Sequence, residues 1–215
     1  MNDWLDITLP LTEGLAPWPG DVTFLKEIVN RIGEGGSVYN LSRIAASAHT
    51  GTHMDAPLHF IAKGKSIDQV PFDAIIGPTR VIEIKDKVSI KADDLKPYNI
   101  KCGERILFKT RNSPASWQNK NFAEDFVFIT KGAAQLLAYT KVALVGVDYL
   151  SVGSPVDPEK GMKDVHEILL GAEIWLIEGL NLTDVKPGNY NLICLPLKLM
   201  NAEGSPVRAV LQRIP

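Results

Sequence analysis

Three of the four histidines in this chain, together with an aspartate, fall within the eleven residues 49–59. They are His49, His53, Asp55 and His59. Neutral imidazole nitrogens and carboxylate oxygens are natural ligands of zinc and similar divalent ions. A histidine on its own is usually a structural residue, but this density of ligating side chains predicts a metal site. A divalent metal bound at such a site makes hydroxide available, so the site in turn predicts hydrolytic chemistry.

The spacing of these residues indicates how the segment is folded. An α-helix would bring His49 and His53 to one face but would turn the aspartate and the third histidine away from it. All four positions are odd-numbered, so an extended chain projects them to the same side. In a straight strand His49 and His53 would lie about 13 Å apart, near the limit for two ligands of one ion. We therefore predict a bent, extended segment in which Gly51 supplies the bend.

Two residues in the C-terminal half are further candidate ligands. Glu178 ends the apolar run 174–177, which is typical of a buried strand, and a buried carboxylate is costly unless it is paired or bound to metal. A glutamate that leaves the strand end for a loop is the alternative. His166 is the remaining histidine and falls in a predicted helix over residues 163–170, where a structural or surface role competes with a ligand role.

Strand patterns outnumber helix patterns along the chain. Helices are predicted by periodicity and by Gly and Pro boundaries at residues 92–95, 132–139 and 163–170. Strands are predicted by alternation or by short apolar runs at residues 3–9, 39–48, 79–85, 105–110, 142–147, 173–178, 191–197 and 207–211. This mixture predicts one α/β domain over residues 1–215.

Composition excludes several classes of partner. The 215 residues carry a formal net charge of -2 with no basic block, so neither nucleic acid nor an anionic membrane is an expected partner. The N-terminal residues lack the apolar stretch of a signal peptide and no apolar run could span a bilayer, so we expect a soluble cytoplasmic protein. Cys102 and Cys194 stand alone and are expected to be small buried hydrophobic residues.

The sequence also resembles a known family. Residues 49–60 read His-Thr-Gly-Thr-His-Met-Asp-Ala-Pro-Leu-His-Phe, which is similar to the signature H-x-G-T-H-x-D-x-P-x-H-F of the cyclase family of metal hydrolases. That family includes bacterial kynurenine formamidases (arylformamidases), which this chain resembles most, and isatin hydrolases. Further similar segments are residues 18–21, 165–182, 195–199 and 205–211. The likeness therefore covers nearly the whole chain.

The resemblance implies a compact α/β fold of the swivelling β/β/α type, with a mixed and partly barrel-like sheet. It implies that His49, His53 and Asp55 hold one divalent ion. It also implies that His166 helps to hold a second ion and that Asp55 and Glu178 bridge the two. Zinc is the expected metal and manganese the alternative, with one or two ions per subunit. Family members commonly form homodimers or homotetramers.

His59 and Trp18 are expected to act on the substrate. His59 lies six residues beyond His53, too far along an extended chain to bind the same ion. We assign it as the general acid/base that takes a proton from the attacking water and delivers it to the leaving amine. A metal-ligand role is the alternative. Trp18 lies in a Pro-Trp-Pro loop, where its indole either packs locally or stacks on an aromatic ring. The resemblance favours contact with substrate.

The resemblance implies an amidohydrolase in which hydroxide formed at the metal attacks an aryl formamide such as N-formyl-kynurenine, releasing formate and an aromatic amine. The chain departs from the formamidase pattern in residues 149–157, where residues are inserted. A cyclic amide, a lactone or another small acyl compound is therefore the alternative substrate. A protein that uses its metal only to hold a ligand is the alternative class. Asp148 and Ser151, in the same region, either orient a ligand or cap a helix.

Overall fold

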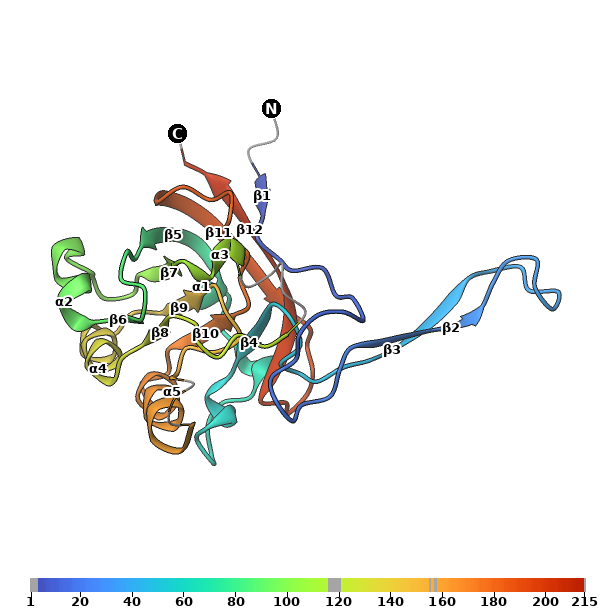
Figure 1. Cartoon of the computed structure of the whole chain (residues 1–215), viewed down its shortest axis with the longest axis horizontal. Helices are drawn as coiled ribbons and strands as arrows, with labels where there is room; N and C mark the ends of the chain where they lie inside the picture. Colours follow the sequence, from blue (N-terminus) through green and yellow to red (C-terminus); the bar gives the residue numbers. More distant parts are fainter. Residues whose placement is uncertain (1–3, 116–120, 155, 157, 215) are drawn as a thin grey trace.

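Seven strands close into a barrel at the centre of the molecule (Figure 1). The computed structural model describes residues 4–115, 121–154, 156 and 158–214. Around the barrel the strands follow the order β4 (His53–Asp55), β10 (Trp175–Glu178), β9 (Leu144–Val147), β7 (Arg105–Lys109), β5 (Ile76–Glu83), β11 (Gly188–Pro196) and β12 (Gly204–Arg213). Pairing of β12 with β4 completes the ring, and β1 (Trp4–Asp6) pairs with the other end of β12.

The barrel is mixed, as the resemblance to the cyclase family implied. Strands β5, β7, β9 and β10 run parallel, whereas β4, β11 and β12 join them antiparallel. Side chains along each strand alternate between two cores, because a strand turns successive residues to opposite faces. In β7, Leu107 packs inside the barrel with residues of β11 and β12, while Ile106 and Phe108 pack outside it against the helices.

Two helices cover the outer face of the barrel, α4 (Lys131–Thr140) and α5 (Lys163–Gly171). Helix α4 begins after Thr130, whose side chain accepts a hydrogen bond from Ala133 N, and it ends at Lys141 in the left-handed conformation. The shorter elements are α1 (Phe72–Ile75), α2 (Ala92–Leu95), α3 (Asn112–Ala115), β6 (Ser89–Ile90), β8 (Phe128–Ile129), the 3-10 turns η1 (Pro57–His59), η2 (Ile67–Gln69) and η3 (Lys96–Tyr98), and the π turn η5 (Pro158–Met162).

A hairpin projects from the barrel (Figure 1). It consists of β2 (Leu25–Asn30), β3 (Leu41–Ala45) and the turn between them, and we call residues 25–45 the arm. The predicted strand over residues 39–48 corresponds to β3, but β2 was missed. Both strands of the arm are exposed almost throughout, so β2 lacks the alternation of apolar and polar residues that marks a half-buried strand.

The other predicted helices and strands are present, with ends shifted by a few residues. Cys194 is buried as expected, but Cys102 is exposed. The expectation for Cys102 was wrong because this residue lies in the turn that precedes β7 rather than in a strand. Among the helices of the described residues, none combines the length and apolar character needed to cross a membrane.

Asp148 joins the end of β9 to the segment that follows β7. Its carboxylate is fully buried and accepts hydrogen bonds from Thr110 N at 2.8 Å, from Thr110 Oγ1 at 2.8 Å and from Ser113 N at 3.2 Å. Burial raises the pKa of this carboxyl group, whereas the hydrogen bonds act in the opposite direction. Asp148 therefore links the end of β9 to the end of β7 and to Ser113 in the short helix α3.

We expect Asp148→Ala to lower the free energy of unfolding by about 3 kcal/mol, because three buried donors lose their acceptor. Urea unfolding followed by circular dichroism measures this change. The matched control is Asp93→Ala, which removes an aspartate whose side chain is largely exposed and should change stability by less than about 0.5 kcal/mol. Equal stability of the two variants would contradict the role of Asp148.

Candidate metal centre and active site

The pairing of β4 with β10 fixes candidate ligands on one face of the barrel. Glu178 lies opposite His53 in this antiparallel pair. The neighbouring pair, Met54 and Ile177, packs in the core inside the barrel. Because side chains alternate along a strand, His53, Asp55 and Glu178 all point to the outer side, where α5 lies. The extended geometry predicted for the histidine segment is confirmed at β4.

Two glycines allow the histidine segment to approach the end of β10. Gly51 and Gly179 both adopt left-handed backbone angles, with φ of +67° and +72°, and a Cβ on Gly179 would collide with the carbonyl of Gly51. Thr52 secures this approach, since its hydroxyl donates to Gly179 O at 2.5 Å and accepts from a backbone N–H of the N-terminal segment at 2.8 Å. The predicted bend at Gly51 is present, and the ring centroids of His49 and His53 are only 5.0 Å apart.

The two carboxylates lie between the histidine rings. Asp55 Oδ1 is 2.9 Å from His49 Nδ1 and 3.4 Å from His53 Nε2. Asp55 Oδ2 is 3.8 Å from His166 Nε2. Glu178 Oε2 is 3.3 Å from His53 Nε2, and its Oε1 is 3.3 Å from His166 Nε2. All five residues predicted as metal ligands therefore meet in one cluster, and each carboxylate faces more than one ring.

Backbone carbonyls orient two of the rings. His53 Nδ1 is 2.9 Å from Gly51 O, and His166 Nδ1 is 2.8 Å from Met162 O. A carbonyl oxygen only accepts hydrogen bonds, so both Nδ1 atoms carry hydrogen. In a neutral ring the Nε2 atom then presents a lone pair toward the carboxylate oxygens. Such a contact is favourable only if a proton or another cation lies between the two groups.

The pKa values of His53 and Asp55 also indicate that the cluster is stabilised by positive charge. Burial by itself lowers the pKa of His53, but the hydrogen bonds and charges of Asp55 and Glu178 outweigh it and raise the pKa to about 10. Burial raises the pKa of Asp55, yet the hydrogen bonds and charges of the surrounding histidines hold it well below its usual range. The cluster therefore binds protons strongly when no other cation neutralises its carboxylates.

The donor atoms of this cluster fit a divalent metal. Among the described residues, the buried polar atoms without a hydrogen-bond partner include His49 Nε2, His53 Nε2 and Asp55 Oδ2. Two groups offer ligand atoms that all lie within 4.8 Å of one another, namely His53 with Asp55 and Glu178, and His49 with Asp55 and His59. Imidazole nitrogen and carboxylate oxygen are the donor types that zinc and manganese accept.

His59 lies closer to the cluster than its place in the sequence indicated. The turn η1 folds the chain back, so the ring of His59 stacks on that of His49 with centroids 4.1 Å apart. Burial lowers the pKa of His59 from its ordinary value of 6.5, which leaves the ring neutral and able to accept a proton at pH 7. The expectation that His59 is out of reach of the ion was wrong. Its position suits both the acid/base role and the ligand role.

A pocket of about 400 Å³ opens onto the cluster. Its lining includes residues 15–21 and Phe24 on one side, and the rings of the metal-ligand candidates on another. Trp18 lines this pocket and also packs edge-on against Phe122 and Phe126, with centroids 5.0 and 6.4 Å away. The two roles that the sequence left open for Trp18 are therefore compatible, because local packing holds the indole at the pocket wall.

The segment 149–157, where the chain departs from the formamidase pattern, borders this pocket. Leu150 and Ser151 line it, and Val152 N donates a hydrogen bond to Glu178 Oε1 at 2.7 Å. The Ser151 hydroxyl accepts from the backbone two residues on, so it shapes its own loop. Positions 155 and 157 lie outside the described residues. This segment therefore touches both the cluster and the space available to a substrate.

Sequence reasoning missed three residues that shape the cluster. Phe60 stacks on His166 with centroids 4.3 Å apart, and its place directly after His59 in the signature was an available signal. Gly204 lies opposite Asp55 in the pairing of β4 with β12, and a Cβ there would come within 2.7 Å of the His49 ring. Glu203 Oε1 is 3.5 Å from His49 Nε2. The last two depend on a strand pairing that no local pattern reveals.

Comparison with known proteins identifies the family of this chain. Residues 5–154 match the family model described as "Putative cyclase". The kynurenine formamidase of Geobacillus thermodenitrificans (strain NG80-2) is 38% identical over 216 residues, which cover 100% of this chain and 99% of that protein. The chain belongs to the cyclase family. The resemblance seen in residues 49–60 is thereby confirmed.

Solved structures support the membership of the cyclase family. A structure described as a "potential metal-dependent hydrolase with cyclase activity" is 31% identical, with a TM-score of 0.83, and the match covers 99% of this chain and 98% of that one. Isatin hydrolase A from Labrenzia aggregata shares the fold at 23% identity, with a TM-score of 0.83 and coverage of 97% and 92%. The predicted α/β fold is confirmed, and this cyclase-family chain is an enzyme of the hydrolase class.

The close approach of Gly51 and Gly179 lets us predict how a side chain at Gly179 would change stability. Gly179→Ala should lower the free energy of unfolding by about 3 kcal/mol or more, because the new Cβ meets a backbone carbonyl and must adopt a left-handed conformation. Gly103→Ala is the matched control, since φ is +75° there but no atom lies within 4 Å of the new Cβ. It should cost about 1 kcal/mol, which is the backbone strain alone. Chemical denaturation of both variants measures the difference, and similar losses would contradict a steric constraint at Gly179.

Proposed function

We propose that this cyclase-family enzyme hydrolyses the amide bond of an aryl formamide of the N-formyl-kynurenine class, releasing formate and an aromatic amine. One observation carries the proposal: the carboxylate–histidine cluster and the indole of Trp18 line the same cavity. The cluster can activate an amide, and the indole offers a flat apolar wall to an aryl group. Full-length similarity to proteins named kynurenine formamidase supports the same substrate class.

The cluster is proposed to hold two divalent cations. His49, His53 and Asp55 would hold one, and His166 would help to hold the other. Asp55 and Glu178 would contribute to both, since each carboxylate lies between the rings of His53 and His166. Zinc is the proposed metal and manganese the alternative. A divalent cation bound there supplies Lewis acidity, which makes hydroxide available near neutral pH and polarises a carbonyl oxygen.

The chain's own residues move the proton and orient the substrate. His59 accepts a proton from the attacking water on a ring nitrogen and delivers it to the amine nitrogen as the C–N bond breaks. The new C–O bond converts the formyl group to formate, and the amine leaves with the proton that His59 returns. The His49 ring, stacked on His59, limits the movement of that ring. Trp18, held by Phe122 and Phe126, positions the aryl group.

A cyclic amide is the second candidate substrate. Leu150 and Ser151 come from the segment that departs from the formamidase pattern, and both line the pocket. Ring opening of a cyclic amide uses the same attack on a carbonyl and the same proton transfer. The choice between the two substrates therefore depends on the shape of the pocket rather than on the cluster.

The substrate assignment is tested with purified enzyme that has been loaded with zinc or with manganese. N-formyl-kynurenine should be turned over with a kcat/KM at least about 100-fold higher than isatin, a difference of about 2.7 kcal/mol in transition-state binding. Formate release and the absorbance of the aromatic product follow the first reaction. The reverse preference would assign the enzyme to cyclic amides, and failure on both would remove the aryl formamide proposal.

The two roles left open for His59 have different consequences for metal content. As general acid/base, His59 can be replaced in His59→Gln with a loss of about 100- to 10,000-fold in kcat. Elemental analysis should then find the same metal content per subunit as in the wild type. A large drop in metal content would instead make His59 a ligand and would contradict its assignment as the acid/base.

Metal binding should stabilise the fold, because a cation neutralises the buried carboxylates. Zinc added to chelator-treated protein should raise the melting temperature, and a concentration 100-fold above Kd corresponds to about 2.7 kcal/mol. Glu178→Gln keeps the shape and the acceptor for Val152 N but removes one charge, so the response should shrink strongly. Glu167→Gln, a partly exposed glutamate next to His166, is the control and should respond as the wild type does. An unchanged response in Glu178→Gln would exclude this cluster as the metal site.

A further inference from the structure

One backbone carbonyl sets the orientation of His166. Met162 O is 2.8 Å from His166 Nδ1, and the other ring nitrogen, Nε2, is then 3.3 Å from Glu178 Oε1. The ring is buried and stacks on Phe60, with an angle of 16° between the two planes. Because a buried N–H needs an acceptor, the position of the Met162 carbonyl determines where Nε2 points.

Gly153 lies directly against Met162. A Cβ on Gly153 would be 2.5 Å from Met162 Cα and 3.0 Å from Met162 Cβ and Cγ. The φ angle of Gly153 lies outside the left-handed region, so the backbone conformation does not require a glycine here. The contact with Met162 alone requires it, and a side chain at this position must displace one of the two segments.

The segment around Gly153 is the more firmly held of the two. Val152 O accepts a hydrogen bond from Ile129 N at 2.8 Å, and Val152 N donates one to Glu178 Oε1 at 2.7 Å. Met162 instead ends the π turn η5, a geometry that is rare in proteins and occurs mostly as a single turn. A side chain at position 153 would therefore move Met162, and with it the carbonyl that orients the histidine ring.

The two halves of the cluster are supported by different segments. Residues 152 and 153 act on Glu178 and, through the π turn, on His166, which would help to hold the second cation. The ring of His53, proposed for the first cation, is oriented by the carbonyl of Gly51 instead. A change at position 153 should therefore reach the second cation and spare the first.

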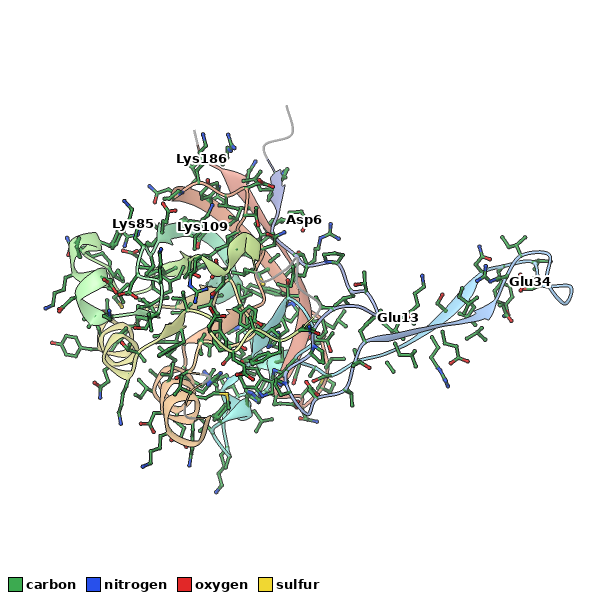
Figure 2. All side chains as sticks on the ribbon, viewed as in Figure 1. Asp6, Glu13, Glu34, Lys85, Lys109 and Lys186 are labelled. Carbon is green, nitrogen blue, oxygen red and sulfur yellow. The ribbon has the colours of Figure 1, made fainter. Side chains whose placement is uncertain are left out.

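Lysine side chains do not take the place of the histidines at this side of the barrel. Lys85, Lys109 and Lys186, labelled in Figure 2, lie away from α5, which Figure 1 labels in the same view. Among the described residues, Asp55 and Glu178 form ion pairs only with histidine rings. A misdirected ring nitrogen would therefore leave the second cation with one donor fewer.

We infer that Gly153 is a positioning residue for the second cation. Without a side chain it lets Met162 lie where the Met162 carbonyl accepts a hydrogen bond from His166 Nδ1. The inference rests on the two-cation site proposed above. Loss of a group that orients a ligating histidine typically lowers metal affinity by about 10- to 100-fold. Gly153→Ala should weaken the second cation by about that factor and leave the first within about twofold of its wild-type affinity.

Zinc binding to chelator-treated protein tests this inference without any substrate. A competition titration against a chromophoric zinc chelator measures the affinity of each ion, and elemental analysis measures the number of ions per subunit. The control is Gly132→Ala, since Gly132 also lies outside the left-handed region. Among the described residues, no atom beyond its own helix lies within 4 Å of a Cβ placed at Gly132. Circular dichroism verifies that each variant is folded.

The wild type and Gly132→Ala should bind two zinc ions with the same pair of affinities. His166→Ala should keep one ion, which identifies the affinity that belongs to the first cation. Gly153→Ala should retain that affinity and lose about 10- to 100-fold in the other. Adding Gly153→Ala to His166→Ala should change nothing further, because the ring that Gly153 positions is then absent.

Met162→Gly answers the same question if Gly153→Ala does not fold. This substitution removes the side chain that faces Gly153 and gives the residue that carries the carbonyl more backbone freedom. It should likewise weaken the second cation while the first keeps its affinity.

Two results in the folded variant would overturn the inference and leave the two-cation site standing. One is an unchanged affinity for both ions. The other is equal weakening of both ions, because position 153 would then affect packing in general rather than His166. A wild type that binds fewer than two zinc ions would instead remove the proposed two-cation site, and the inference with it.

Discussion

The burial of two negative charges at one place governs this structure. Asp55 and Glu178 lie on the outer face of the barrel with almost no exposed surface, and burying an unpaired carboxylate costs several kcal/mol. The surrounding groups compensate for that cost. Histidine rings approach both carboxylates, and the orientation of His53 and His166 is fixed by carbonyls that accept from Nδ1. Among the described residues, the buried atoms His49 Nε2, His53 Nε2 and Asp55 Oδ2 are left without a hydrogen-bond partner, and a bound cation would satisfy them.

This cluster was largely predictable from the sequence because its ligands are concentrated in one segment. The odd-numbered spacing of His49, His53 and Asp55 required an extended chain, and a bend was needed to bring the two rings together, so a residue such as Gly51 had to follow His49. Glu178 was found because a charged residue at the end of a buried apolar strand demands a partner. The error on His59 has an equally physical cause. Spacing along the sequence gives the reach of an extended chain, whereas the turn η1 reverses its direction.

The parts that could not be predicted depend on contacts between distant segments. Gly204 matters because β12 pairs with β4, and nothing near it in the sequence indicates that the His49 ring will lie against it. The strand β2 was not predicted from the sequence for another reason. Sequence patterns identify strands that bury one face against the body of their own chain, and the arm buries neither. The missing pattern in residues 25–30 thus reflects a strand that pairs with β3 but leaves both of its faces exposed.

The division between barrel and loops explains how one cluster can serve different substrates. The ligand candidates lie on or beside β4, β10 and α5, where strand pairing and core packing hold them. The pocket wall includes residues 15–21, Phe24, Leu150 and Ser151, which lie in loops and tolerate change more readily than the barrel does. A substitution at one of these lining residues alters the space beside Trp18 but leaves the carboxylates and imidazoles in place. The proposed chemistry therefore depends on residues that the barrel holds, whereas the proposed choice of substrate depends on the loops that supply residues 15–21, Phe24, Leu150 and Ser151.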